Sequence, residues 1–269
     1  MRRPAPSMAR WFILVGLLAF WELMPRTRLI PELFLPSLSK TLTVLYSDRH
    51  DYIAALSVTL YEVAVAMLFA CGGGILLGAL VGGLALLRTL LLPVFSSLYA
   101  VPIVILYPIF TAWLGIGSES KIAFAAAYGF FPVMLSTAAG IRTIDPQYIV
   151  AARSMGATLR QQITRVIIPA SIPTVLTGLR LGGALTIIGV IVAEMLTSAA
   201  GIGYLVTRSR TILDSPRVFA GILMILFLSV MFDILARLIE RRTLAWQTAG
   251  RRRRKSREDL QAVPAAAPA

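Results

Sequence analysis

The chain has 269 residues, of which 57% are hydrophobic and only 14% are charged. A soluble domain of this length would carry about 25% charged residues, so the composition excludes an ordinary soluble protein and indicates a polytopic membrane protein. The net charge of +13 does not indicate nucleic-acid binding, because nine of the 26 basic residues lie at or beyond Arg237 and five lie between Arg142 and Arg180. Basic residues beside apolar spans are typical of topology signals and of contacts with anionic membrane lipids.

The chain also lacks residues for several kinds of chemistry. It has one cysteine, Cys71, and one histidine, His50. This count excludes an intramolecular disulfide and a metal site built from several His or Cys side chains, so we expect no metal. No G-x-x-x-x-G-K-[ST] phosphate-binding loop occurs, and we find no catalytic constellation. We therefore expect neither an enzyme nor a bound cofactor.

The N-terminal part predicts one membrane span followed by a surface helix. Three basic residues precede the apolar run Trp11–Met24, and no small-x-small cleavage site follows it, so we interpret the run as a first transmembrane helix. Residues 1–34 then comprise a cytoplasmic tail, this helix and the start of an outer loop. Leu38, Leu42 and Leu45 recur at helical spacing, which predicts a short amphipathic helix at the membrane interface.

Five more spans are expected, because apolar runs of about 20 residues are long enough to cross a bilayer. They are predicted at Val63–Leu87, Leu90–Leu114, Ile122–Ile141, Thr174–Leu196 and Val218–Ile239. Pro93, Pro102 and Pro108 break the third span, so we expect it to be packed inside the bundle, where neighbouring helices satisfy the freed carbonyl groups. The fold class is therefore an all-α membrane protein with six transmembrane helices, of which the second to sixth form a core domain at 35–246.

The charge distribution predicts the topology. With six spans both termini lie in the cytoplasm, and 18 basic residues then fall on the cytoplasmic side against 8 on the outer side. This bias agrees with the preference of Lys and Arg for cytoplasmic loops. The tail 247–269 is basic and poor in apolar residues, which predicts disorder.

Glycines and acidic residues within the spans each have two interpretations. Two rows of glycines have members four residues apart, and each row serves packing within the chain, a dimer seam or a moving surface. The rows are Gly74, Gly78 and Gly82, and Gly178 and Gly182. Glu194 lies deep in the fifth span and is either a gate residue or a buried structural carboxylate. Glu62, near the outer end of its helix, is expected to reach water. Asp233 and Arg237 are four residues apart and predict a structural ion pair.

The segment Tyr148–Pro169 is basic and amphipathic and lies on the predicted cytoplasmic side. Val150, Ala151, Met155 and Leu159 give it an apolar face. Gly156 either permits a turn between two short helices or lets another backbone come close. Pro169 and Pro173 are expected to interrupt the helix before the next span. The segment is either a docking site for a cytoplasmic partner or an interfacial helix on lipid headgroups.

The spacing within this segment resembles a family motif. Val150-Ala151-Ala152-x-x-x-Gly156, followed by Val166-x-Ile168-Pro169, is similar to the E-A-A-x3-G-x9-I-x-L-P motif of ABC importer permeases. Leu35-Pro36-Ser37, Trp113 to Gly117, Leu176 to Arg180, and Ala193-Glu194 with Gly201 to Tyr204 resemble the nitrate, sulfonate and taurine branch. The resemblance covers about Leu35 to Trp246.

The resemblance implies a type I importer: a homodimer of permease chains in the inner membrane, two ATP-binding subunits and an extracytoplasmic solute-binding protein. ATP would be bound by the partner subunit. The coupling segment lies within 142–173, and the coupling residues carried over are Val150, Ala151, Ala152, Arg153, Met155, Gly156 and Pro169. Val150 departs from the family's Glu, so a salt bridge from that acid to the ATPase is not available here.

The predicted function is therefore the membrane permease of an ATP-driven importer for a small solute, of the sulfonate, taurine or nitrate type or a vitamin precursor. The translocation pathway is expected to include Pro102, Tyr107, Pro108 and Glu194. A secondary transporter would be expected to show ion-coupling acids and inverted repeats. A membrane-embedded enzyme would require catalytic groups. Both stay open as alternatives, and the substrate itself does not follow from the sequence.

Overall fold

The computed structural model describes residues 6–27 and 29–261, with side chains described from 11 to 243 except at 28. Every regular element in these residues is helical, as the sequence predicts for an all-α protein. The elements are α1 (Pro6–Arg26), α2 (Leu38–Ser47), α3 (Arg49–Gly83), α4 (Ala85–Tyr99), η1 (Ile103–Leu106), α5 (Tyr107–Leu114), α6 (Ser118–Arg142), α7 (Pro146–Ser154), α8 (Leu159–Gln162), η2 (Ile163–Ile167), α9 (Ile168–Leu196), α10 (Ile202–Thr211) and α11 (Ser215–Gln261).

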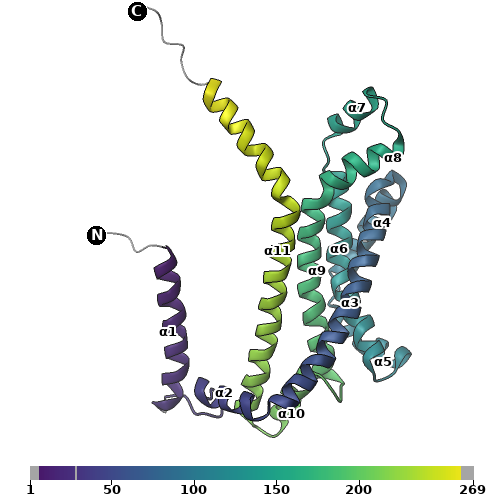
Figure 1. The fold of residues 1–269 in the computed structure, drawn as a ribbon. Coiled ribbons are helices and arrows are strands. Elements are labelled where there is room, and N and C mark those ends of the chain that lie inside the picture. Colours follow the sequence, from purple (N-terminus) through teal and green to yellow (C-terminus); the bar gives the residue numbers. More distant parts are fainter. Residues whose placement is uncertain (1–5, 28, 262–269) are drawn as a thin grey trace, which may run out of the picture.

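The core consists of α6 packed between α3 and α9 (Figure 1). Both glycine rows face α6. A Cβ atom at Gly78 would lie 2.5 Å from a carbonyl oxygen of α6, and Gly74 and Gly82 are equally close to that helix. Gly178 and Gly182 bring α9 close against α6 in the same way. Small residues allow helix backbones to approach in lipid, where van der Waals contact replaces the hydrophobic effect. The interpretation as packing within the chain is confirmed.

Four helical stretches in the described residues are long and apolar enough to cross a membrane, and a fifth span results if α4 and η1–α5 are counted together. The four stretches are Arg49–Gly83, Ser118–Arg142, Leu159–Leu196 and Ser215–Thr243. The predicted first span forms α1, whose apolar side chains are exposed. The structure thus supports the predicted class of fold, while the count of six spans is not confirmed in number.

The predicted third span is a broken helix. The axes of α4 and the η1–α5 stretch meet at 86°, and Pro102 lies at the break. Contrary to the expectation of a helix packed inside the bundle, α4 has no buried residue in this chain. The break at Pro102 brings η1 and α5 against α6, where Ile103 and Tyr107 are buried, and leaves α4 at the edge of the core, with Leu91 and Phe95 only partly buried.

The expectation that Pro169 and Pro173 interrupt the helix before the fifth span is wrong. The helix runs without a gap from Leu159 to Leu196, through a π-helical turn at Ile163–Ile167. Pro169 lies in the first turn of α9 and Pro173 inside it. A π-turn changes the carbonyl pairing by one residue and so accommodates residues that lack an N–H donor.

The two ends of the bundle carry different elements. Figure 1 shows α7 and α8 at one end and α2, α5 and α10 at the other. The last helix, α11, continues to Gln261, into the stretch for which a disordered tail was predicted. Low apolar content prevents a packed core, but the Arg, Lys, Glu and Gln residues of this stretch are good helix formers. Residues 1–5 and 262–269 lie outside the described residues.

Candidate functional site

The segment between α6 and α9 forms two short helices joined by a turn. Asp145 caps α7 by accepting a hydrogen bond from the backbone N–H of Gln147. Thr158 and Gln161 form a reciprocal capping box at the start of α8. Gly156 has φ +76° and open space around it, so glycine is required here by the backbone conformation and not by a close neighbour. The predicted turn at Gly156 is confirmed.

The surface of this segment is apolar where it faces away from the bundle. Val150 is 61% exposed and Met155 81% exposed, and Tyr148 and Leu159 are also exposed. Ala152, in contrast, is buried. The segment therefore has its own internal packing together with an uncovered apolar face.

Polar contacts inside the segment fix the two helices relative to each other. The Arg153 Nε donates to Gln162 Oε1 at 3.3 Å, and Gln162 Nε2 donates to the carbonyl of Ala157 at 2.9 Å. Ile168 and Pro169 continue the segment directly into α9. A hydrogen bond thus joins α7 to α8, and α8 continues into α9 without a gap.

The residues predicted to line the pathway are dispersed in this chain. Pro102 and Pro108 are exposed at the break between α4 and α5, whereas Tyr107 is buried against Phe124. Glu194 is 1% exposed and lies near the end of α9. Its carboxylate accepts hydrogen bonds from the Thr59 hydroxyl and from the backbone N–H of Gly203, each at 2.7 Å.

Glu62 corrects one prediction. It is fully buried and forms an ion pair of 2.5 Å with Lys121, which is also buried, so it does not reach water. Ser118 donates to the same carboxylate at 2.8 Å, and the Lys121 ammonium donates to Ser198 at 3.1 Å. The prediction placed Glu62 just before a span that begins at Val63, but α3 begins at Arg49, so Glu62 lies well inside the helix. The neighbouring helix α6, which supplies the lysine, covers Glu62.

A second ion-pair group joins α9 to α11. Asp233 pairs with Arg237 at 2.7 Å, as its spacing predicted, and also with Arg180 at 2.6 Å. The Arg180 contact was missed. An arginine inside a predicted span was the available signal, since a charge at that depth requires an acidic partner.

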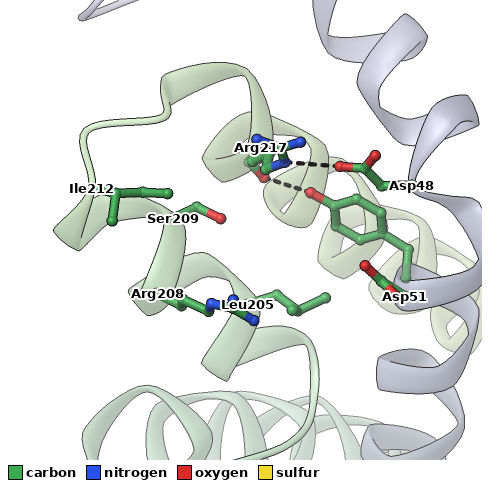
Figure 2. A pocket seen from close by; sticks show the side chains of 8 residues that line it. Asp48, Asp51, Leu205, Arg208, Ser209, Ile212 and Arg217 are labelled. Carbon is green, nitrogen blue, oxygen red and sulfur yellow. Dashed lines mark hydrogen bonds and ion pairs between the residues drawn. The ribbon is translucent and has the colours of Figure 1, made fainter.

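Two hollows lie at the end of the bundle that carries α10. The smaller, of about 250 Å³, is shown in Figure 2. There the Arg217 guanidinium donates to Asp48 at 2.8 Å and holds the pKa of that carboxyl below its usual value. The larger hollow, of about 530 Å³, is mainly apolar. Glu194, Tyr204 and Arg208 contribute polar groups to it.

Among the described residues, no group of three or more His, Cys, Asp or Glu side chains could hold a metal ion. The fold and these features define a multi-pass helical membrane protein with a structured segment at one end of its core. The family follows from the sequence. Residues 74–245 match the family model of the binding-protein-dependent transport system inner membrane component, and the chain belongs to that family.

Named relatives agree with this assignment. The taurine transport system permease protein of Escherichia coli strain K12 is 31% identical, over 87% of each chain. The formylaminopyrimidine transport permease protein of Halalkalibacterium halodurans is 28% identical, over 92% of this chain and 99% of the relative. A structure of the MetNI methionine ABC transporter in an inward-facing conformation matches with a TM-score of 0.62 at 18% identity, over 71% of this chain and 95% of the other, which shows the fold of a type I ABC importer permease.

The chain is therefore the permease subunit of an ABC importer, a transport subunit and not an enzyme. Membership of the family implies an ATP-binding subunit and a substrate-binding protein as its partners. The apolar helices and the family place it in the inner membrane as a multi-pass protein.

Proposed function

We propose that α7 and the turn after it are the docking site for the ATP-binding subunit. The observation that carries this proposal is the uncovered apolar face of a segment that stands clear of the bundle (Figure 1). The proposed contact residues are Val150, Ala151, Arg153, Met155 and Gly156, with Ala152 packed beneath them and Pro169 at the junction with α9. Apolar groups left in water at one end of a membrane protein favour a partner that covers them.

Docking of the ATP-binding subunit should depend more on shape complementarity than on charge at this site. Val150 stands where the family motif has an acid, so the docking face offers apolar contact and the guanidinium of Arg153. The capping box and the hydrogen bonds of Gln162 keep the face rigid, which lowers the entropy cost of docking. Motion of the ATP-binding subunits would then be transmitted to α9, giving alternating access.

The test is reconstitution with the ATP-binding subunit and the substrate-binding protein. Met155→Asp places a charge on the exposed face and should abolish copurification of the ATPase and ATP-driven uptake, while the permease stays in the membrane. The matched control is Thr43→Asp, at an exposed residue of α2, which lies at the end of the bundle opposite α7. Full uptake by Met155→Asp would refute docking at α7. Uptake in the parent that needs an ion gradient and no ATP would indicate a secondary transporter.

The assembly and orientation are part of the same proposal. We propose a homodimer with lipid around it, because α4 and α5 leave large apolar side chains uncovered in the single chain. The excess of basic residues supports cytoplasmic termini, on the same side as α7. Disulfide cross-linking between cysteines placed on α5 of each copy tests the dimer. A monomeric permease in the active complex would contradict it.

For the substrate we propose a small organic anion of the sulfonate type, as in the taurine relative. Arg208 beside a mainly apolar hollow of about 530 Å³ is compatible with a molecule that has one anionic and one apolar part. A pyrimidine precursor, as in the formylaminopyrimidine relative, is the second candidate. Calorimetry of the cognate binding protein with taurine, an alkyl sulfonate and a formylaminopyrimidine decides between them.

A further inference from the structure

The N-terminus of α10 is capped by side chains from two other helices. The backbone N–H of Ile202 donates to the Thr59 hydroxyl at 3.0 Å, and that of Gly203 donates to the Glu194 carboxylate at 2.7 Å. Thr59 lies on α3 and Glu194 on α9. Helices usually satisfy these first N–H groups with a residue of their own N-cap, and Gly201 has no side chain to do so. The orientation of α10 therefore depends on these two residues.

Glycines at the start of α10 leave room for the Glu194 carboxylate. Gly201 has φ +102°, and a Cβ atom added there would collide with the Glu194 carboxylate. Gly203 is equally tight against the Cβ of Glu194. Glycine at both positions lets the acid lie directly against the first turn of α10. An anion at a helix N-terminus is also stabilised by the helix dipole.

A second buried contact holds the connection that leads into α10. Lys121 donates to Ser198, and Ser198 in turn bonds the carbonyl and the N–H of Ala200. Lys121 is itself paired with Glu62, whose second carboxylate oxygen has no hydrogen-bond partner among the described residues. Buried ion pairs of this kind contribute little net stability, because desolvation offsets the attraction, so an arrangement that fixes one conformation is a better account of them.

These contacts lie at the end of the bundle opposite α7 (Figure 1). We propose that Glu194 and Thr59 form a latch, the α10 latch, which holds α10 against α3 and α9 in one of the two access states and releases it in the other. Both act on α10 as positioning residues, through hydrogen bonds to its first N–H groups, and Glu194 also borders the larger hollow. The proposal rests on the permease function proposed above, which assigns this end of the bundle to the outer side.

The experiment measures the exposure of α10 in the full complex in sealed cells. Cys71→Ala removes the native cysteine, and Ser209→Cys places a near-isosteric thiol at a buried position of α10. In this background, Glu194→Gln keeps the volume of the side chain but loses the charge and one acceptor oxygen. We expect it to raise the modification rate by a membrane-impermeant maleimide about tenfold, the scale expected for loss of a hydrogen bond to a charged group.

Three further variants separate a latch from a purely structural role. Thr59→Val should raise the rate as Glu194→Gln does, and Thr59→Ser, which keeps the hydroxyl, should restore the parent rate. Glu119→Gln, an exposed acid in the first turn of α6, is the matched control and should equal the parent. In the reconstituted complex, the two latch variants should also show higher ATP hydrolysis without binding protein, so that stimulation by the binding protein falls.

Rates within twofold of the parent in Glu194→Gln and Thr59→Val would overturn the proposal. The proposal would also be overturned if Glu194→Gln, Thr59→Val and Thr59→Ser all failed to assemble into the complex, because the two residues would then be needed for folding alone. If the binding protein does not stimulate the parent complex, the proposed function fails. The modification rate of the thiol still tests the latch in that case, because this measurement requires only that α10 lies on the outer side of the membrane.

Discussion

The buried pair of Glu62 and Lys121 gives the most direct test of how polar contacts stabilise this bundle. Their side chains are 0% and 5% exposed, and the charged atoms are 2.5 Å apart. Removing one partner leaves the other buried and unpaired, which costs about 3–5 kcal/mol in known cases. We expect Lys121→Gln to lower the melting temperature of the detergent-solubilised protein by about 10 °C, taking about 2–4 °C per kcal/mol for a protein of this size.

The double variant carries the physical argument. Glu62→Gln combined with Lys121→Gln leaves two neutral groups that can form a hydrogen bond with each other. The free energy of unfolding of this double variant should therefore exceed the value expected from adding the two single changes by at least about 2 kcal/mol, which is within the range of coupling energies for contacting groups. The exposed pair of Glu32 and Lys40 is the control, where we expect coupling of about 1 kcal/mol or less. Additivity within about 0.5 kcal/mol at the buried pair would refute the reasoning, because the two charges would then not stabilise each other.

Three other expectations follow from the described geometry. Gly78→Ala forces a Cβ to 2.5 Å from an α6 carbonyl oxygen and should destabilise the protein by about 1–3 kcal/mol in thermal melting experiments. In the control Gly72→Ala the added Cβ meets nothing within 4 Å, so that variant should be neutral or slightly more stable. Gly156→Ala strains a left-handed residue in open space and should cost about 1–2 kcal/mol without abolishing uptake; complete loss would point to a steric role at the ATPase. The pKa of Asp48 is lowered in the folded protein by Arg217, so its contribution is present above the unfolded pKa of about 3.9 and is lost as pH falls through the folded value. The melting-temperature difference between the parent and Asp48→Asn should thus be constant from neutral pH to about 5 and shrink below about 4, and an unchanged difference at pH 3 would contradict this assignment.

Local composition determined which parts of the fold could be predicted. The apolar runs predicted the long helices, and the glycine rows predicted close packing, because both features are carried by residues near one another in the sequence. The turn at Gly156 was predictable for the same reason. The start of α3 at Arg49 was not, since its first turns are polar and helical while the prediction followed only the apolar run from Val63.

The polar contacts between helices could not be predicted from the sequence. Glu62 was expected to reach water because neither the start of α3 at Arg49 nor the contact with Lys121 could be predicted from the sequence. The partners of Glu194 present the same difficulty, because Thr59 lies 135 positions away along the chain. Pairings of this kind depend on which faces of α3, α6 and α9 meet, and one sequence without relatives does not specify those faces.

The arrangement of α9 connects the two ends of the molecule. The proposed coupling segment continues into α9 without a gap, and Glu194 lies near the opposite end of the same helix. An α-helix rises about 1.5 Å per residue, so the length of α9 separates the two sites. Gly178 and Gly182 hold the middle of α9 tightly on α6, which favours movement of the helix as a rigid body and opposes bending there. The π-turn at Ile163–Ile167 is the irregular part of its helical path, and such turns can shift register at small cost. A displacement of α7 by the ATP-binding subunit would therefore reach the Glu194 contact with α10 as a tilt or rotation of α9, which is the motion that the proposed α10 latch would respond to.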